Sequence, residues 1–167
     1  MTTDNTPTPG ASGTAPAHDH GPRLRWAQHA PEVYRAMIAL DAAARNDVDP
    51  ALAELVKIRA SQLNKCAFCL DMHLTDARKA GESEERLQLL LAWAEAPDLY
   101  TPKERAALAL TEAITILTDG FVPDEVYAQA AAHFDETELA HLIAVIVAIN
   151  NWNRVNVTVR QPPGEEL

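Results

Sequence analysis

The sequence predicts an all-α protein, a compact helical domain of about six to eight helices. Apolar residues recur at helical spacing along most of the chain, and alternation at period two is nearly absent. Several Asp, Ser and Thr residues stand where such helices would begin. With 167 residues, 47% of them hydrophobic and 23% charged, the chain is long enough for one domain with a real core.

Composition separates this domain from two tails. Residues 1–21 contain Thr, Pro, Gly, Ala and Ser with few large apolar groups, which cannot offset the entropy cost of ordering, so we expect a flexible tail. Its segment His18-Asp19-His20 could touch a metal, but a solvated polar tail is the favoured interpretation and we assign it no role. The helical domain is expected over 22–160 and a short C-terminal tail over 161–167.

The first half of the domain is predicted to fold into a helical hairpin. Helical spacing begins at Arg23 and breaks before Pro31. Asp49-Pro50 then begins a new helix, with Asp as the N-cap and Pro at the first helical position. A break at Asn64-Lys65 leads to a helix over 66–80, which ends before a glycine.

Four more helices are predicted in the second half, at 83–94 (closed by a proline at 97), 101–119, 123–133 and 135–155. Thr101-Pro102-Lys103-Glu104 is a capping box and gives the clearest helix start in the chain. Asp135 with Glu138 forms a second box. Because valines alternate over 155–159, the last residues of the domain could instead be extended.

Charge and hydropathy narrow the possible partners. The net charge is −10 and no cluster of Lys and Arg is present, so we expect no nucleic-acid partner. The apolar run Leu142–Ile149 is shorter than the ~20 residues needed to span a bilayer, so we read it as a buried helix and expect no membrane association. The N-terminus lacks the pattern of a secretion signal, which favours a cytoplasmic location.

Both cysteines lie in Cys66-Ala67-Phe68-Cys69, with His73 four residues later and Glu54 twelve residues before Cys66. In a helix, Cys66, Cys69 and His73 share one face, and a glutamate on the preceding helix could complete the cluster. The Cα atoms of such a cysteine pair lie roughly 5 Å apart, which permits a disulfide. In a reducing compartment this pair is more often catalytic, redox-cycling or metal-binding than structural.

The residue types suit thiol chemistry. A helix N-terminus stabilises a thiolate, and His73, oriented by Glu54, could take or relay the thiol proton. A peroxide would oxidise one cysteine to a sulfenic acid, with which the other condenses to a disulfide. Two alternatives stay open: a zinc site with the same four ligands, and small buried core cysteines. A thioredoxin-like fold would need a strand before the motif, where the pattern is helical.

The segment 54–73, with Glu54, Cys66, Cys69 and His73 in place, closely resembles the alkyl hydroperoxidase D-like branch of the carboxymuconolactone decarboxylase superfamily. Residues 148–154 resemble the closing helix of its shorter members, so the resemblance spans roughly residues 25–160. It implies an all-helical homo-oligomer, commonly a trimer or hexamer, and a thiol peroxidase that uses no metal or organic cofactor.

Carried over by position, the resemblance implies that Cys69 is the peroxidatic cysteine, Cys66 its proton donor and resolving partner, and His73 with Glu54 the proton relay. Helix-end electrostatics alone would instead favour Cys66, which is nearer the N-terminus. Phe68 stands where some members have a second histidine. We expect it to pack in the core or to shape an apolar entrance.

The function expected from these observations is the reduction of organic hydroperoxides or hydrogen peroxide through a Cys66–Cys69 disulfide, which an external dithiol protein reduces again. A redox sensor or thiol-disulfide exchange protein with little turnover is the alternative. Lactone decarboxylation is disfavoured, because that reaction uses no cysteine pair, although a specialised biosynthetic enzyme stays open. The polar residues of the segment Asn150–Arg154 are expected to form a patch at a subunit interface.

Overall fold

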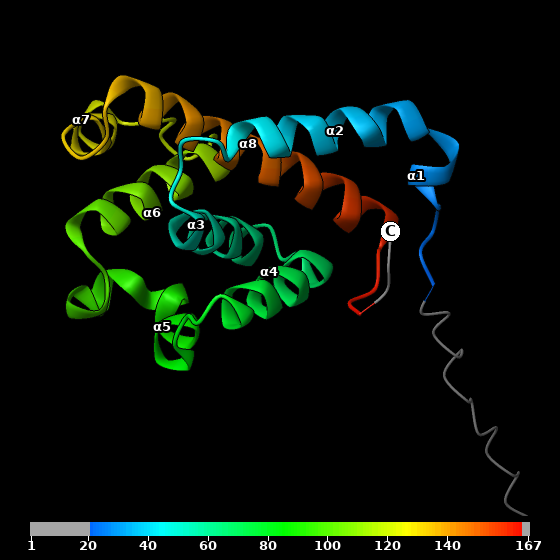
Figure 1. Ribbon diagram of the computed structural model, residues 1–167, viewed down its shortest axis with the longest axis horizontal. Coiled ribbons are helices and arrows are strands. Elements are labelled where there is room, and N and C mark those ends of the chain that lie inside the picture. The colour runs from blue at the N-terminus through cyan, green and yellow to red at the C-terminus, as the bar shows by residue number, and fades with distance from the viewer. Residues whose placement is uncertain (1–20, 165–167) are drawn as a thin grey trace, which may run out of the picture.

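The computed structural model describes residues 21–164, which form eight α-helices and two short 3₁₀ helices without a strand (Figure 1). The all-α prediction is therefore confirmed. In chain order the elements are α1 (Trp26–His29), α2 (Pro31–Ala44), α3 (Pro50–Leu63), α4 (Ala67–Lys79), α5 (Glu84–Leu89), η1 (Leu90–Glu95), η2 (Pro97–Leu99), α6 (Pro102–Thr115), α7 (Asp124–Ala131) and α8 (Glu136–Val159).

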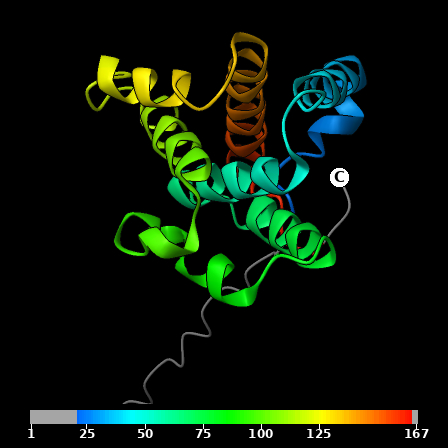
Figure 2. The ribbon, with the colours of Figure 1, turned by 60° about the vertical axis from the view of Figure 1, so that its left-hand side comes forward.

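Helix α8 is the central element of the fold. It packs against α2, α3, α4, α6 and α7, and Figure 2 shows it running through the middle of the bundle. Leu142, Val145 and Ile146 on this helix are fully buried. By length and composition α8 could also cross a membrane, but half of its apolar window is buried against the other helices. We therefore read α8 as the core helix of the domain, as the sequence predicted for residues 142–149.

Three predicted helix starts are confirmed by their capping hydrogen bonds. The Asp49 side chain accepts from the Leu52 N–H at 3.0 Å at the start of α3. The capping boxes at Thr101 and Asp135 are both complete, with the side chain and backbone bonds present at α6 and α8. These local bonds stabilise helix ends without help from tertiary contacts, which explains why the sequence alone located them.

Three predicted helix ends are wrong. The helix that begins after Ser83 ends at Leu89, and a 3₁₀ segment with a kink at Ala92 follows it. Helix α6 stops at Thr115, about one turn earlier than expected. The valines at 155–159 belong to α8 and are not extended, because Val159 continues the buried face of that helix.

A tight turn joins α3 to α4 and places the cysteines. Asn64 ends α3, Lys65 takes a left-handed conformation with φ of 56°, and Cys66 returns to an extended one. The Cys66 N–H donates to the carbonyl of Ser61 at 3.0 Å, which closes the turn. The predicted hairpin with Cys66 at the start of the second helix is thus confirmed.

Residues 1–20 of the predicted N-terminal tail, with the segment His18-Asp19-His20, and residues 165–167 of the C-terminal tail lie outside the described residues. The domain boundaries at 22–160 stay a prediction. At the start of the described chain, the Arg23 N–H donates to the Val159 carbonyl at 2.7 Å, which ties residue 23 to the end of α8.

Candidate functional site

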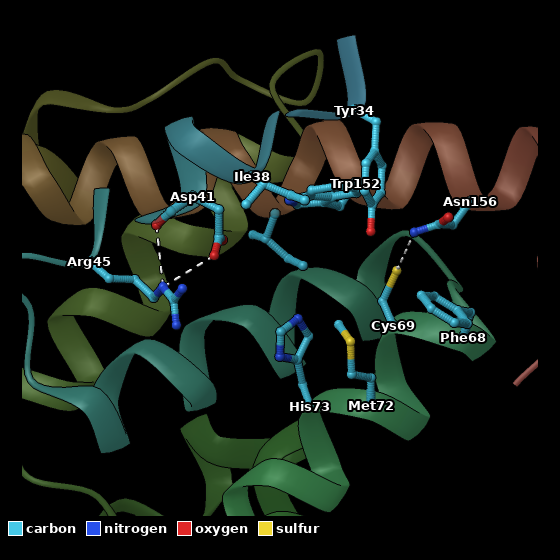
Figure 3. A pocket seen from close by; sticks show the side chains of 11 residues that line it. Tyr34, Ile38, Asp41, Arg45, Phe68, Cys69, Met72, His73, Trp152 and Asn156 are labelled. Atoms are coloured by element: carbon cyan, nitrogen blue, oxygen red, sulfur yellow. Dashed lines mark hydrogen bonds and ion pairs between the residues drawn. The ribbon is translucent and has the colours of Figure 1, made fainter. Parts of the chain in front are cut away.

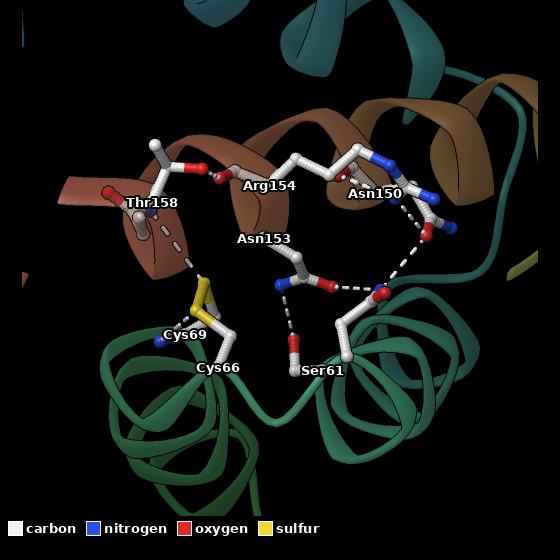
Figure 4. The surroundings of a disulfide bond; sticks show 9 residues. Ser61, Cys66, Cys69, Asn150, Asn153, Arg154 and Thr158 are labelled. Atoms are coloured by element: carbon white, nitrogen blue, oxygen red, sulfur yellow. Dashed lines mark hydrogen bonds between the residues drawn. A yellow bond between two sulfur atoms is a disulfide. The ribbon is translucent and has the colours of Figure 1, made fainter. Parts of the chain in front are cut away.

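Cys66 and Cys69 form a disulfide at the N-terminus of α4, with their Cα atoms 5.4 Å apart (Figure 4). Cys66 is the N-cap of this helix, and its Sγ accepts a hydrogen bond from the Cys69 N–H at 3.3 Å. Both side chains are buried. The pair can therefore exist in the oxidised form without rearrangement of the helix that carries it.

His73 lies one turn further along α4 and meets Glu54 of α3, as the sequence predicted. The distance from His73 Nδ1 to Glu54 Oε2 is 2.8 Å. Because a carboxylate only accepts, Nδ1 carries the hydrogen, and in the neutral ring Nε2 keeps a free lone pair. The structure thus brings the four predicted site residues together at the α3–α4 hairpin.

A buried lysine stands behind this pair. The Nζ of Lys57 lies 3.8 Å from Glu54 Oε1 and 3.5 Å from Asp41 Oδ1 of α2. Burial alone would raise the pKa of Glu54, but the hydrogen bond with His73 and the positive charges of His73, Lys57 and Arg45 outweigh it. The pKa of Glu54 is therefore lowered, and the carboxylate is ionised at neutral pH.

A pocket of about 200 Å³ opens beside the disulfide, between α2, α4 and α8 (Figure 3). Most of its wall is apolar or aromatic, from Tyr34, Ile38, Phe68, Met72, Ile149 and Trp152. Its polar lining comes from Asp41, Arg45, Cys69, His73 and Asn156. Cys69 lines the pocket and Cys66 does not. A molecule in the pocket therefore lies beside Cys69 and not beside Cys66.

Aromatic packing holds two walls of the pocket in place. The rings of Trp26, Tyr34 and Trp152 contact one another, with centroid distances of 5.7, 5.8 and 6.1 Å. Such tilted and edge-to-face pairs add stability beyond the area they bury. Phe68 is buried and also lines the pocket, so both roles expected for it are present.

Asn156 was missed by the sequence reasoning. It lies on α8, is 2% exposed, and its Nδ2 donates to Cys69 Sγ at 3.7 Å (Figure 3). One signal was available, because Asn150, Asn153 and Asn156 recur every three residues along α8. That spacing places three amides on one buried face.

Two residues of the expected interface patch at 150–154, Asn150 and Asn153, are internal, which corrects the prediction for them. Asn153 Nδ2 donates to Ser61 Oγ at 2.9 Å, and Asn64 Nδ2 donates to both Asn150 and Asn153 at 2.9 Å (Figure 4). Both asparagines are buried within the chain. Both amide oxygens accept from Asn64 of the α3–α4 turn, so these asparagines hold the hairpin that carries the cysteines against α8.

The donors for a zinc site are engaged differently in this structure. Glu54 and His73 hydrogen bond to each other, and the two sulfurs are bonded to each other. Among residues 21–164, no group of three or more His, Cys, Asp or Glu side chains is arranged to hold a metal ion.

Comparison with known proteins shows the family to which this chain belongs. Residues 31–113 match the model of the Carboxymuconolactone decarboxylase family. The uncharacterized protein YdfG of Bacillus subtilis (strain 168) is 42% identical over 138 residues, which cover 82% of this chain and 93% of YdfG.

Solved structures share the fold. ATU0492 of Agrobacterium tumefaciens, a protein of unknown function proposed to be the antioxidant defence protein AhpD, is 36% identical with a TM-score of 0.83. That match covers 87% of this chain and 99% of ATU0492. The alkylhydroperoxidase AhpD core of a peroxidase-related protein from Ralstonia eutropha JMP134 has a TM-score of 0.73 at 18% identity, covering 86% and 77% of the chains. This last likeness shows the fold alone.

Proposed function

Since this chain belongs to the carboxymuconolactone decarboxylase family and holds a Cys66–Cys69 disulfide beside a pocket, we propose that it is a cofactor-independent thiol peroxidase. Its substrates would be small organic hydroperoxides or hydrogen peroxide. The observation that carries the proposal is the placement of Cys69, which lines the pocket together with His73, whereas Cys66 lies outside the lining.

The first step oxidises Cys69. Its thiolate attacks the terminal oxygen of the hydroperoxide and forms an S–O bond while the O–O bond breaks, so that the sulfur becomes a sulfenic acid. The other oxygen leaves as an alkoxide, or as hydroxide from hydrogen peroxide, and takes up a proton to give the alcohol or water. The proton that the alcohol needs comes from the Cys69 thiol by way of His73. We assign this role to Cys69 because it lines the pocket and Cys66 does not. The helix N-terminus alone would favour Cys66 as the more acidic thiol.

His73 and Glu54 would move that proton. With Nδ1–H held by Glu54 at 2.8 Å, the Nε2 lone pair of the neutral ring accepts the thiol proton and returns it to the leaving oxygen. The Glu54 carboxylate stabilises the imidazolium that forms in between, and its lowered pKa keeps it charged for this purpose.

The second step forms the disulfide seen in the structure. The Cys66 sulfur attacks the Cys69 sulfenic acid, and the hydroxyl group leaves as water. An external dithiol protein then reduces the disulfide by thiol exchange and becomes oxidised itself. One hydroperoxide and one dithiol thus give one alcohol, one water and one disulfide per cycle.

Pocket size and lining favour a small, partly apolar hydroperoxide. A volume of about 200 Å³ is below the ~300–1,000 Å³ typical of sites for drug-sized ligands. We place the reaction in the cytoplasm, where dithiol reductants keep such pairs cycling. We further propose a homo-oligomer, a trimer or hexamer, in line with the family resemblance.

The decisive experiment is peroxide consumption by the reduced protein with a recycling dithiol present, comparing the wild type with Cys66→Ser and Cys69→Ser. The proposal requires multiple turnovers that both substitutions abolish, with a single sulfenic acid formed by the Cys66→Ser protein. One stoichiometric oxidation that added reductant does not accelerate would instead identify a redox sensor or thiol-exchange protein.

A further inference from the structure

We propose that Asn156 is a catalytic residue whose side-chain amide donates a hydrogen bond to the Cys69 thiolate and so activates the cysteine that attacks the peroxide. This inference rests on the proposed peroxidase function, but its first test needs no peroxide. Nothing in the sequence motif of cysteines, histidine and glutamate includes this residue, which lies 87 positions beyond Cys69.

The contact is already present in the oxidised protein. Asn156 Nδ2 lies 3.7 Å from Cys69 Sγ, and both side chains are buried and line the same pocket. A disulfide sulfur is a weak acceptor, whereas a thiolate carries a full negative charge. Reduction therefore turns this contact into a charge-assisted hydrogen bond, which is roughly twice as strong as a neutral one.

Cys69 needs such a donor more than Cys66 does. Burial raises the pKa of a thiol by disfavouring its charged form. The N-terminus of α4 offsets this effect mainly for Cys66, because Cys66 is the N-cap and the Cys69 N–H points to the Cys66 sulfur at 3.3 Å. The amide of Asn156 reaches the Cys69 sulfur from α8, on the other side of the site.

Purely structural packing does not explain this amide. Its only hydrogen bond within residues 21–164 is the one to Cys69, and its buried Oδ1 accepts none from these residues. By contrast, the amides of Asn150 and Asn153 on the same helix have partners on both their oxygen and nitrogen atoms. Buried polar atoms without a partner cost free energy, and they are retained most readily where they serve a site.

The other charged groups around the pocket form ion pairs or hydrogen bonds with one another and have none to Cys69. Arg45 pairs with Asp41 at 3.1 Å on α2, and Figure 3 shows this pair at the end of the pocket away from Cys69 and Asn156. On α3, Lys57 pairs with Asp41 and Glu54, and Glu54 holds His73 of α4. The titratable groups that line the pocket with Cys69 are thus His73 of α4 and the hydroxyl of Tyr34 of α2, besides the paired Asp41 and Arg45. Asn156 is the uncharged donor with a hydrogen bond to the Cys69 sulfur.

The effect on rate has a definite sign at each pH. A hydrogen bond to a charged group changes a thiol pKa by about one to two units. The nucleophilicity of a thiolate falls with its pKa by a Brønsted coefficient of about 0.4–0.5. Loss of the Asn156 amide should therefore slow the reaction of Cys69 with peroxide about three- to tenfold at neutral pH. At alkaline pH, where the thiolate is fully formed, it should leave the rate equal or faster.

The test uses the Cys66→Ser protein as the parent, so that Cys69 is its only thiol. Asn156→Ala, Asn156→Asp and the control Asn151→Ala are added to it. Asn151 is an exposed asparagine of the same helix that does not line the pocket. The thiolate absorbance and the rate of alkylation by iodoacetamide are followed against pH, and the rate of oxidation by hydrogen peroxide is measured on the same samples.

We expect the pKa of Cys69 to rise in Asn156→Ala and further in Asn156→Asp, whose carboxylate is an acceptor beside the thiolate, with no change in Asn151→Ala. The peroxide rates of parent and Asn156 variants should cross between neutral and alkaline pH. An unchanged pKa, or a rate reduced by the same factor at every pH, would overturn the proposal. The nearly isosteric Asp variant answers the question if the Ala variant does not fold.

The two hypotheses fail separately. A parent protein that iodoacetamide alkylates with an Asn156-dependent pKa but that peroxide does not oxidise would refute the peroxidase function and leave the donor role standing. If peroxide oxidises the parent and the Asn156 variants equally well, the donor role is refuted and the peroxidase function stands.

Discussion

The Nζ of Lys57 lies 3.5 Å from Oδ1 of Asp41, and this buried contact joins α2 to the helix that carries Glu54. The lysine side chain is only 3% exposed, and its second partner, Glu54, lies 3.8 Å away. One cation thus links a wall of the pocket to the proposed proton relay.

Lys57→Met should destabilise the protein by about 1–3 kcal/mol, because two carboxylates lose a partner while they are largely removed from water. Urea denaturation at neutral pH measures this free energy of unfolding. Lys79→Met is the matched control, since Lys79 pairs with Asp76 on an exposed surface, where an ion pair contributes about 0–1 kcal/mol. Equal effects of the two substitutions would contradict a structural role for Lys57.

Glu54 should make stability depend on pH on the acid side. Its folded pKa is lowered below the usual 4.5, so its contribution is fully present above that value and is lost as the pH falls through the folded pKa. The stability difference between the wild type and Glu54→Gln should therefore shrink as the pH is lowered from neutral to below 4.5. Unfolding curves across this range measure it. Glu85→Gln, on the exposed side of α5, should show no such convergence.

His73→Gln should lower kcat/KM for hydroperoxides by about 10²-fold or more, the usual contribution of a general acid–base group. The control is His141→Gln, because His141 contacts the Ala44 carbonyl and Asp47 outside the pocket. Steady-state rates with a recycling dithiol decide the matter. If the two histidine variants retain equal activity, the relay assigned to His73 is wrong.

Local signals in the sequence predicted the helix starts and the hairpin. The side chains that cap α3, α6 and α8 bond to backbone within three residues, so their pattern is visible in the sequence itself. The kink at Ala92 depends on a distant contact. The indole of Trp93 donates to Glu112 at 2.7 Å, and the same carboxylate oxygen accepts from Arg59 at 2.8 Å. Such tertiary bonds override local helix preference and leave no local signature.

The same distinction applies to the site. Cys66, Cys69 and His73 lie within eight residues, so helical spacing placed them on one face, and the family resemblance added Glu54 from the preceding helix. Asp41 and Asn156 could not be assigned, because their partners Lys57 and Cys69 come from helices whose relative placement the spacing does not reveal. Lys57 was missed although its partner Glu54 lies three residues before it on the same helix. Arg59 likewise received no role from the sequence, although it ties α3 to Glu112 of α6.

The pocket can be tested as the route to Cys69 by adding bulk to its wall. Ile38 is half-exposed and lines the pocket, whereas Leu40 on the same helix is exposed to a similar extent and does not. Ile38→Trp should reduce kcat/KM for a bulky hydroperoxide such as cumene hydroperoxide about tenfold or more, in line with the cost of misfit in a small pocket. Hydrogen peroxide should be affected far less, because it still reaches the sulfur. Leu40→Trp should leave the ratio of the two substrates unchanged. A ratio that stays constant in Ile38→Trp as well would mean that hydroperoxides reach Cys69 by another path.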